Sequence, residues 1–511
     1  MPTFKDYTMN QLQLPLSFED IIPENHLVRV VNTIVDSLDL TPLYDRYKDG
    51  GCPAYHPQMM LKVMIYSYSQ KTYSSRMIAK ALRENINFMW IAGGNKPDFR
   101  TINRFRLDMK DVIEDVFYEV VKLLIEKKYI KLQNYFLDGT KIEANANKYT
   151  FVWNKSIRNY DQKLDEKIKN HLREIDHMVA EENEIYLEED LEEKGENSRI
   201  TAEQVAAVVE SIDKKLEENP KDRVLKKKAR EFKKDILPRK QKYEASFETF
   251  DGRNSYSKTD HDATFMRMKE DAMLNGQLKP GYNIQIGTEN RYIVGFTIHP
   301  NPTDTKTMIP HLKHLEEKLG KLPENIIADA GYGSEENYEY IEEKQLGSYV
   351  KYNKFHWEKK KKNRENPYLA ENLPYDGETD SFVCRNGKRL VHIGNRKYIT
   401  EAGYETRRDY YRCEDCSGCP YAEECKKTEN PRTIRISHRL NELKKKANEN
   451  LCSKKGLELR SLRVVEVEQT FGRIKGCWSF RRFLLRGKDK VKIEWGLLAI
   501  AHNISKMALE G

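Results

Sequence analysis

The chain has 511 residues, of which 39% are hydrophobic and 33% are charged, a balance typical of a soluble protein with several domains. No apolar run approaches the roughly 18 residues of a membrane span, and the first residues lack the pattern of a signal peptide. We therefore expect a cytoplasmic, nucleoid-associated protein without membrane contact. The formal net charge of +8 is too small to indicate a nucleic-acid partner by itself.

Charge is distributed unevenly along the chain. The stretches RRFLLRGKDKVK and KKKKNR are dense in basic residues, whereas residues 176–196 are strongly acidic. Basic patches on a nearly balanced chain indicate a directed phosphate-binding surface. A lysine-rich surface that only contacts solvent would give the same pattern, so charge alone leaves both interpretations open.

The hydrophobic pattern divides the chain into six segments. We predict a helical N-terminal DNA-binding domain, the first strand of an α/β core, a charged helical insertion, the rest of the core, a cysteine-rich insertion and C-terminal core helices. In that order, the predicted ranges are 1–130, 131–154, 155–250, 251–351, 352–455 and 456–511.

The first segment has apolar residues at helical spacing. Helices are predicted at 26–38, 56–70, 74–85 and 98–128, with Asp98 as the cap of the last one. Arg100 and Arg104 lie near the start of that helix, and arginine suits contacts to phosphates and base edges. A helix-turn-helix that reads DNA is one interpretation. A plain helical bundle is the other, because the linker between the helices is longer than the usual short turn.

The middle of the chain alternates between helical and extended patterns. The segment 155–250 is typical of charged helices that are exposed to solvent or coiled-coil-like. Residues 352–455 read as irregular and polar, and the chain ends with two helices. The predicted core elements are strands at 134–140, 282–288, 292–300, 325–329 and 347–352, with helices at 305–319 and 334–344. This order predicts an α/β fold with a mixed sheet.

Two aspartates end apolar strands. Asp138 precedes Gly139 in NYFLDGT, and Asp329 precedes Ala-Gly in NIIADAGYGS. Open sheets bind ligands at the carboxyl ends of their strands, and glycines there allow a substrate or backbone to come close. Phosphodiester chemistry needs such carboxylates, because they can hold two Mg²⁺ ions about 4 Å apart. A single strand-end aspartate is more often a turn residue, but two of them followed by a helical glutamate favour a metal site.

That glutamate is either Glu466 or Glu468, on the predicted helix at 462–478. At about 100° per residue, the two flank an apolar stripe on opposite sides. Glu468 shares its side with Gly472, which would let DNA approach, and with Lys475, which could hold a phosphate. The geometry favours Glu468 without excluding Glu466. The stripe consists of Val464, Val467, Phe471, Ile474 and Trp478.

Five cysteines cluster in the fifth segment. In a cytosolic chain, clustered cysteines favour a metal over disulfides, and CxxCxxC with a fourth cysteine can supply a tetrahedral Zn²⁺ site. We predict a structural zinc ion, with one cysteine to spare. An iron–sulfur cluster fits less well, and unliganded cysteines are the alternative. The zinc candidates are Cys384, Cys413, Cys416, Cys419 and Cys425, whereas Cys52, Cys452 and Cys477 are isolated.

Several motifs are specific in combination, although each one alone would be weak. They are FLDGTKIEANANKYTF, SKTDHDATFMRMK with GYNIQIG, ADAGYGS, and VEVEQTFGRIKG with FRRFLLRGKDKVKIEWGLLAIAHNISK. Together they resemble the motifs of DDE transposases with an RNase H-like (retroviral integrase) core. They particularly resemble bacterial insertion-sequence enzymes with a cysteine-bearing insertion. SFEDIIPENHLVRVVN, YHPQMMLKVMIYSY and SSRMIAKALREN are similar to the helical N-terminal domain of such enzymes, so the resemblance spans nearly the whole chain.

The resemblance implies that Asp138, Asp329 and Glu468 are catalytic and bind two Mg²⁺ (or Mn²⁺) ions per site. It selects Glu468 because related enzymes carry a lysine seven residues after the catalytic glutamate, where this chain has Lys475. Their arginine four residues before that glutamate is absent here, and Arg463 is the nearest basic residue. The expected DNA contacts are Lys475, Arg473, Arg463, Tyr332, Arg481, Arg482 and Arg486, together with Arg100 and Arg104.

The sequence as a whole predicts a transposase that cleaves at insertion-sequence ends and joins the freed 3′-hydroxyl to target DNA. Its expected partners are double-stranded DNA, as terminal inverted repeats and as target, and a second copy of the chain in a homodimer on DNA. One alternative is an RNase H-like nuclease without joining activity. Another is a catalytically inactive DNA-binding descendant, against which the complete acidic triad argues.

Overall fold

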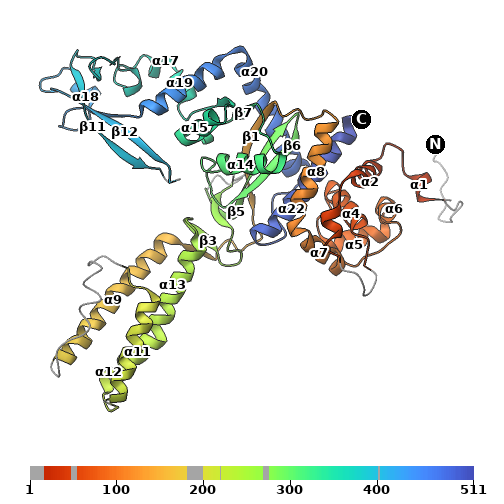
Figure 1. Cartoon of the computed structure of the whole chain (residues 1–511), viewed down its shortest axis with the longest axis horizontal. Coiled ribbons are helices and arrows are strands. Elements are labelled where there is room, and N and C mark those ends of the chain that lie inside the picture. Colours follow the sequence, from red (N-terminus) through yellow and green to blue (C-terminus); the bar gives the residue numbers. More distant parts are fainter. Residues whose placement is uncertain are drawn as a thin grey trace, which may run out of the picture. The chain divides into compact units, whose positions relative to one another are not determined.

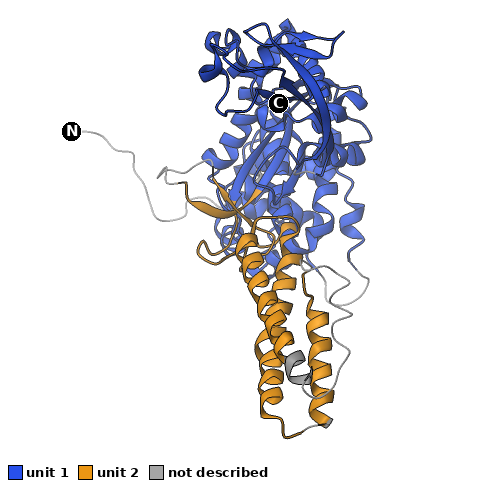
Figure 2. Ribbon diagram, turned by 90° about the vertical axis from the view of Figure 1, so that its left-hand side faces the viewer, with its two compact units in different colours: residues 1–142, 283–485, 489–511 blue, residues 143–282, 486–488 orange. Residues whose placement is uncertain are grey.

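The computed structural model describes residues 17–47, 54–180, 199–218, 220–268, 276–400 and 403–510. Cys52 and most of the acidic stretch at 176–196 lie outside these residues. The chain forms two compact units (Figure 2): unit 1 contains Met1–Ile142, Asn283–Leu485 and Asp489–Gly511, and unit 2 contains Glu143–Tyr282 and Arg486–Lys488. Helices make up 53% and strands 17%, which confirms the mixed α/β class. Within the described part of the chain, no helix is long and apolar enough to cross a membrane.

Unit 1 begins with short helices around an apolar core. Asp98 caps α7 as predicted, because its Oδ1 accepts a hydrogen bond from the Thr101 N–H at 2.7 Å. The single helix predicted at 98–128 is wrong, since a 3₁₀ turn at Met109–Asp111 separates α7 from α8. The helices are α1 (Phe18–Ile21), α2 (Leu27–Ser37), α3 (Thr41–Tyr44), α4 (Pro57–Ser69), α5 (Ser75–Glu84), α6 (Ile86–Ile91), α7 (Phe99–Asp108) and α8 (Ile113–Glu126).

The main sheet has the strand order β4-β5-β1-β7-β8, and β6 also pairs with β5. Its strands are β1 (Asn134–Glu143), β4 (Thr264–Arg267), β5 (Leu278–Glu289), β6 (Tyr292–His299), β7 (Asn325–Ala328) and β8 (Gly347–Val350). β5 and β6 form an antiparallel hairpin, whereas β1, β7 and β8 run parallel. The sheet is therefore mixed, and the carboxyl ends of β1 and β7 lie at the same edge.

Helices pack against this sheet. α8 and α14 (Met308–Leu319) contact β6, α15 (Glu335–Glu343) contacts β8, and α20 (Lys454–Arg463) contacts β7 and β8. The long apolar C-terminal helix α22 (Lys488–Glu510) is buried over most of its length. Gly496 of this helix allows close packing, because a Cβ there would lie 2.6 Å from the Ile113 side chain.

A second sheet occupies the cysteine-bearing region, whose predicted irregular structure is therefore wrong. The order is β13-β12-β11-β10-β9, all antiparallel. A small core of Leu390, Tyr411 and their neighbours supports it. The elements are α16 (Phe355–Glu358), α17 (Lys361–Arg364), β9 (Tyr375–Asp376), β10 (Ser381–Val383), β11 (Arg389–Ile399), β12 (Glu405–Cys413), α18 (Ala422–Cys425), β13 (Thr433–Ile436) and α19 (His438–Cys452). Its strands are polar on much of both faces, which hides the alternation that usually reveals a strand.

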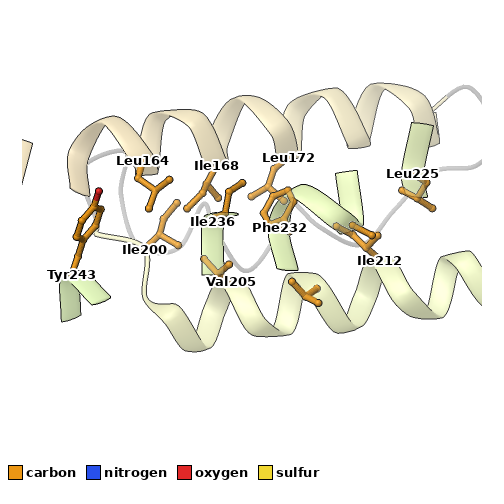
Figure 3. Packing of buried hydrophobic residues seen from close by; sticks show 12 residues of the cluster. Leu164, Ile168, Leu172, Ile200, Val205, Ile212, Leu225, Phe232, Ile236 and Tyr243 are labelled. Carbon is orange, nitrogen blue, oxygen red and sulfur yellow. The ribbon is translucent and has the colours of Figure 1, made fainter. Parts of the chain in front are cut away.

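Unit 2 consists of packed helices and short strands. Its helices are α9 (Asn154–Ala180), α11 (Ala202–Glu218), α12 (Arg223–Glu231) and α13 (Leu237–Phe250), and its strands include β2 (Phe151–Trp153), β3 (Ser255–Ser257) and β4 (Thr264–Arg267). Figure 3 shows apolar side chains from these helices pointing toward one another, among them Leu164, Ile168 and Phe232. The charged insertion is thus a helical bundle with a core of its own.

A buried cation lies inside that bundle. Lys240 is fully buried, and its Nζ donates to the carboxylates of Asp161 and Asp165. Arg199 adds a second ion pair to Asp161, with 2.7 Å between Nε and Oδ2. Removal of one partner from such a buried ion pair destabilises the fold, because the remaining charge stays buried without its partner.

Candidate active site where β1 and β7 stop pairing

Two aspartates lie where β1 and β7 stop pairing. Asp329 directly follows β7, but the predicted strand end at Asp138 is wrong, because β1 continues to Glu143. The parallel register runs up to the residues just before Asp138 and Asp329. Asp138 is only 5% exposed, whereas the side chain of Asp329 is 40% exposed. Each carboxylate accepts a hydrogen bond from a following glycine, at 2.9 Å from Gly139 N and 2.8 Å from Gly331 N. The local strand patterns and the parallel pairing together place both acids at one edge.

Arg463 joins the two carboxylates. Its Nη2 lies 3.2 Å from Asp138 Oδ2 and 3.6 Å from Asp329 Oδ2. The arginine side chain is 12% exposed, and its Nε is buried with no hydrogen-bond partner among the described residues. In this conformation the Arg463 guanidinium contacts two acids and little solvent. A direct contact with DNA would require the guanidinium to be exposed. Its interaction with both acids could not be read from the sequence, since Arg463 follows them by a long stretch of chain.

A third carboxylate, missed in the sequence, lies beside this pair. Asp304 accepts hydrogen bonds from Asn283 Nδ2 at 2.7 Å and from Gln285 Nε2 at 2.8 Å. Both amides belong to β5. A Cβ on Gly139 would lie 2.3 Å from Gln285 Nε2 and 2.5 Å from Asp304 Oδ1, so only glycine fits after Asp138. The available signal was an acid shortly after the strand that ends at His299.

Tyr332 completes this polar network. It is fully buried, and its hydroxyl donates to Gln285 Oε1. Burial raises the pKa of Tyr332 well above its usual range, with Asp304, Asp138 and Asp329 adding to the effect. The hydroxyl is therefore a neutral donor. The Tyr332 ring does not face solvent. A direct contact with DNA would require an exposed ring.

The helix after β13 and α19 carries both candidate glutamates. It runs from α20 through a π turn at Val464–Glu468, α21 (Gln469–Gly472) and a second π turn at Arg473–Cys477. Glu466 is 8% exposed and accepts a hydrogen bond from the Arg291 N–H in the β5–β6 turn. Burial raises the pKa of Glu466. Glu468 is exposed, so it is the glutamate whose carboxylate remains accessible.

The predicted faces of this helix are partly wrong. Val464, assigned to the apolar stripe, is 51% exposed, and Lys475, assigned to the accessible side with Glu468, is 7% exposed. Residues five apart are about 140° apart on a regular α-helix, but π turns with i→i+5 hydrogen bonds change that phase. The helical wheel at about 100° per residue therefore fails across this segment.

The donor set suits a divalent cation only in part. Asp138 and Asp329 offer carboxylate oxygens, which Mg²⁺ prefers, and both already contact one guanidinium, so they face a common cation position. Among the described residues, however, no group of three His, Cys, Asp or Glu side chains gathers as a metal site. Two carboxylates fit a metal that keeps several waters and a substrate phosphate among its ligands.

The other predicted DNA contacts fall into two groups. Arg100, Arg104 and Arg482 are exposed. Lys475 Nζ instead donates to the Lys141 carbonyl at 2.9 Å. Arg473 is partly buried against the Trp478 ring, and burial lowers the pKa of its guanidinium. Exposed Arg481 donates from Nε to the Lys475 carbonyl, and within unit 2 exposed Arg486 donates to the Asn145 carbonyl at 2.7 Å.

The predicted zinc site has little structural support. Cys384, Cys413 and Cys416 share the core of the second sheet, and all are free thiols. Burial raises the pKa of Cys413 to about 12. Cys425 accepts a hydrogen bond from the Arg432 guanidinium at 3.2 Å. These cysteines do not form a metal-binding group in the described part of the chain, so zinc stays a prediction.

Comparison with known families gives two matches. Residues 383–508 match a transposase DDE domain, and residues 16–108 match a transposase domain of the DUF772 type. The first match includes Glu468 and Arg463 but neither aspartate. No curated protein and no solved structure matched the chain. The mixed sheet and its helices agree with the RNase H-like core of such enzymes. Two transposase family models therefore match separate parts of the chain, which is consistent with a DDE transposase of the insertion-sequence type.

Proposed function

We propose that this transposase cleaves DNA at the ends of an insertion sequence and joins the freed 3′-hydroxyl to target DNA in one acidic site. The observation that supports it most is the pair Asp138 and Asp329, whose carboxylates share the Arg463 guanidinium at 3.2 and 3.6 Å. Two acids that face one cation position suit phosphodiester chemistry.

In the proposed site, Asp138, Asp329 and Glu468 hold two Mg²⁺ (or Mn²⁺) ions. When bound, such ions activate the attacking oxygen and stabilise the leaving one. Asp138 is held in place by burial and by the Gly139 N–H, whereas the more exposed Asp329 leaves room for substrate. Arg463 would exchange its acidic partners for the DNA phosphate, since guanidinium groups bind both kinds of oxyanion.

The proposed substrate is double-stranded DNA, both as terminal inverted repeats and as target. Arg100 and Arg104 of α7 and Arg482 near the C-terminus are exposed, as phosphate contacts require. Because two ends must be handled together, we propose a homodimer on DNA. Such contacts predict binding that weakens steeply with salt.

The decisive experiment compares Asp138→Asn with the wild type on a labelled duplex that carries the element's ends, with Mg²⁺. We expect the wild type to cut and join, and the variant to lose both activities while it still binds DNA. Asp45→Asn, which removes an exposed charge in the same unit, is the matched control and should retain activity. A fully active Asp138→Asn variant would show that the metal assignment is wrong.

The same assay separates the alternatives. Cutting without joining by the wild type would favour a nuclease. Binding without either reaction would favour an inactive DNA-binding descendant. Both outcomes would contradict the proposed function.

We also propose a structural zinc ion among Cys384, Cys413, Cys416, Cys419 and Cys425. Support comes from the three cysteines that share one small core. Metal analysis of the purified chain should find about one zinc ion per chain, as expected for a single four-ligand site. A protein without zinc that melts at an unchanged temperature in the presence of chelator would overturn this proposal.

A further inference from the structure

The hairpin formed by β11 and β12 extends beyond the sheet to which it belongs (Figure 1). β10 pairs with β11 only at Arg389–Val391, and β13 pairs with β12 only at Asp409–Arg412. Residues 396–399 and 405–408 therefore pair only with each other among the described residues. We call these two stretches the ribbon.

The ribbon concentrates positive charge on two neighbouring rungs. Arg396 lies opposite Arg408, and Lys397 lies opposite Arg407. Like charges directly across a pair of strands are destabilising. Charged residues do protect free strand edges from pairing, but alternating acids and bases would do so without this repulsion. A concentrated positive ribbon instead indicates an anionic partner.

Few acids neutralise these cations. Lys397 pairs with Glu405, with 2.7 Å between Nζ and Oε1, and both side chains are more than half exposed. The Arg407 side chain is exposed and forms no ion pair or side-chain hydrogen bond within the part of the chain that the structure describes, although its charge acts on Glu405. The two remaining arginines stack on tyrosines, with Arg396 over Tyr410 at 5.3 Å and Arg408 over Tyr398 at 3.8 Å. Stacking orients a guanidinium without removing its charge.

The end of the hairpin lies close to the acidic site. Thr406 Oγ1 donates to Glu335 at 2.7 Å, so the ribbon rests on α15, the helix that follows Asp329. Thr400 and Tyr404 line a cleft of about 230 Å³ together with Thr305. Thr305 in turn donates to the Gly331 carbonyl at 2.9 Å, two residues after Asp329. A duplex whose reacting phosphate lies at the two aspartates would therefore pass near the ribbon.

We propose that the ribbon binds duplex DNA beside the reacting phosphate, with Lys397 and Arg407 contacting backbone phosphates. These two lie opposite each other on one face of the ribbon, whereas Arg396 and Arg408 lie on the other face. A two-stranded antiparallel ribbon has the width that a major groove admits. Contacts of this kind position DNA without reading its sequence. This inference rests on the proposed function, because it places the ribbon relative to a DNA-cleaving site.

The test measures DNA binding without divalent metal, so that cleavage does not interfere. Wild type and Lys397→Ala/Arg407→Ala are titrated against a labelled duplex over a series of KCl concentrations. Log K falls with log[salt], and each lost phosphate contact makes this slope less negative by about 0.9. The slope of the double variant should therefore be less negative than that of the wild type by about 1.8. The matched control Lys122→Ala/Lys127→Ala removes two exposed cations, one in α8 and one at its C-cap, and should leave the slope unchanged.

The possible outcomes are distinct. An unchanged slope in the ribbon variant, or an equal fall in the control, overturns the inference. If the wild type cuts DNA with Mg²⁺ but the ribbon variant keeps its slope, only the ribbon inference fails. If the wild type binds no DNA at all, the proposed function fails first. Lys397→Gln/Arg407→Gln keeps the aliphatic stems and must show the same loss, which guards against a folding defect in the alanine variant.

Discussion

Substitution of Gly139 by alanine tests the geometry next to Asp138 most directly. The added Cβ would lie 2.3 Å from Gln285 Nε2 and 2.5 Å from Asp304 Oδ1. Ordinary contact is about 3.5 Å, so the neighbours or β1 must move by about 1 Å. The neighbours cannot move freely, because Asp304 and Gln285 hydrogen-bond each other at 2.8 Å and Gln285 is fully buried.

The expected cost has two parts. Overpacking of a fixed site destabilises a protein by about 1–3 kcal/mol. A displacement of about 1 Å at a reacting group lowers the rate by about 100-fold, and Asp138 adjoins the substituted residue. Gly139→Ala should therefore melt at a lower temperature and cleave DNA much more slowly than the wild type.

The assay combines thermal unfolding with single-turnover cleavage of a labelled duplex. Gly377→Ala is the matched control, because its Cβ would meet only the Tyr375 ring at 3.9 Å. The control should match the wild type in both measurements. If Gly139→Ala also matches the wild type, the rigid network around Asp138 does not exist as described.

Three further predictions follow from buried charges. Arg463→Ala leaves the two site aspartates without their shared cation, so Mg²⁺ should raise the thermal midpoint of this variant more than that of the wild type; equal shifts would contradict this role. The pKa of Glu466 is raised by burial, so its folded form binds protons more readily and stability should fall as pH rises from about 4.5 through that raised pKa. Glu466→Gln should flatten this part of a melting curve against pH, and an unchanged curve would refute the assignment. Lys240→Met removes the ammonium from Asp165 and leaves Asp161 with Arg199 as its one ion-pair partner among the described residues, so it should cost about 3–5 kcal/mol in unfolding experiments. The half-exposed Lys233→Met should cost less than about 1 kcal/mol, and similar losses in both variants would refute the reasoning.

Local sequence pattern was enough for features that depend on neighbouring residues. The strands that lead to Asp138 and Asp329 were predicted from short apolar runs followed by glycine, and the structure has a strand at both places, although β1 continues past Asp138 to Glu143. The Asp98 cap was also predicted, since a cap involves only the next few residues. These features follow from local backbone preferences and need no knowledge of distant contacts.

Predictions from the sequence pattern were wrong where the backbone departs from the regular period of a helix or strand. The π turns at Val464–Glu468 and Arg473–Cys477 change which side chains face the core, so Lys475 is buried rather than accessible. The strands of the second sheet also escaped prediction. β11 is polar on both faces because much of it is exposed, and without a buried face no alternation appears.

The sequence by itself determined the α/β class, a family resemblance and the presence of strands that lead to Asp138 and Asp329. The tertiary structure alone decided what those residues contact. Each of these contacts joins segments that are far apart in the chain. Arg463 lies between Asp138 and Asp329, Asp304 lies beside Gly139, and the basic ribbon lies near the same site. The energy of a charge or a buried polar group depends on its partners in space, and sequence spacing does not specify those partners.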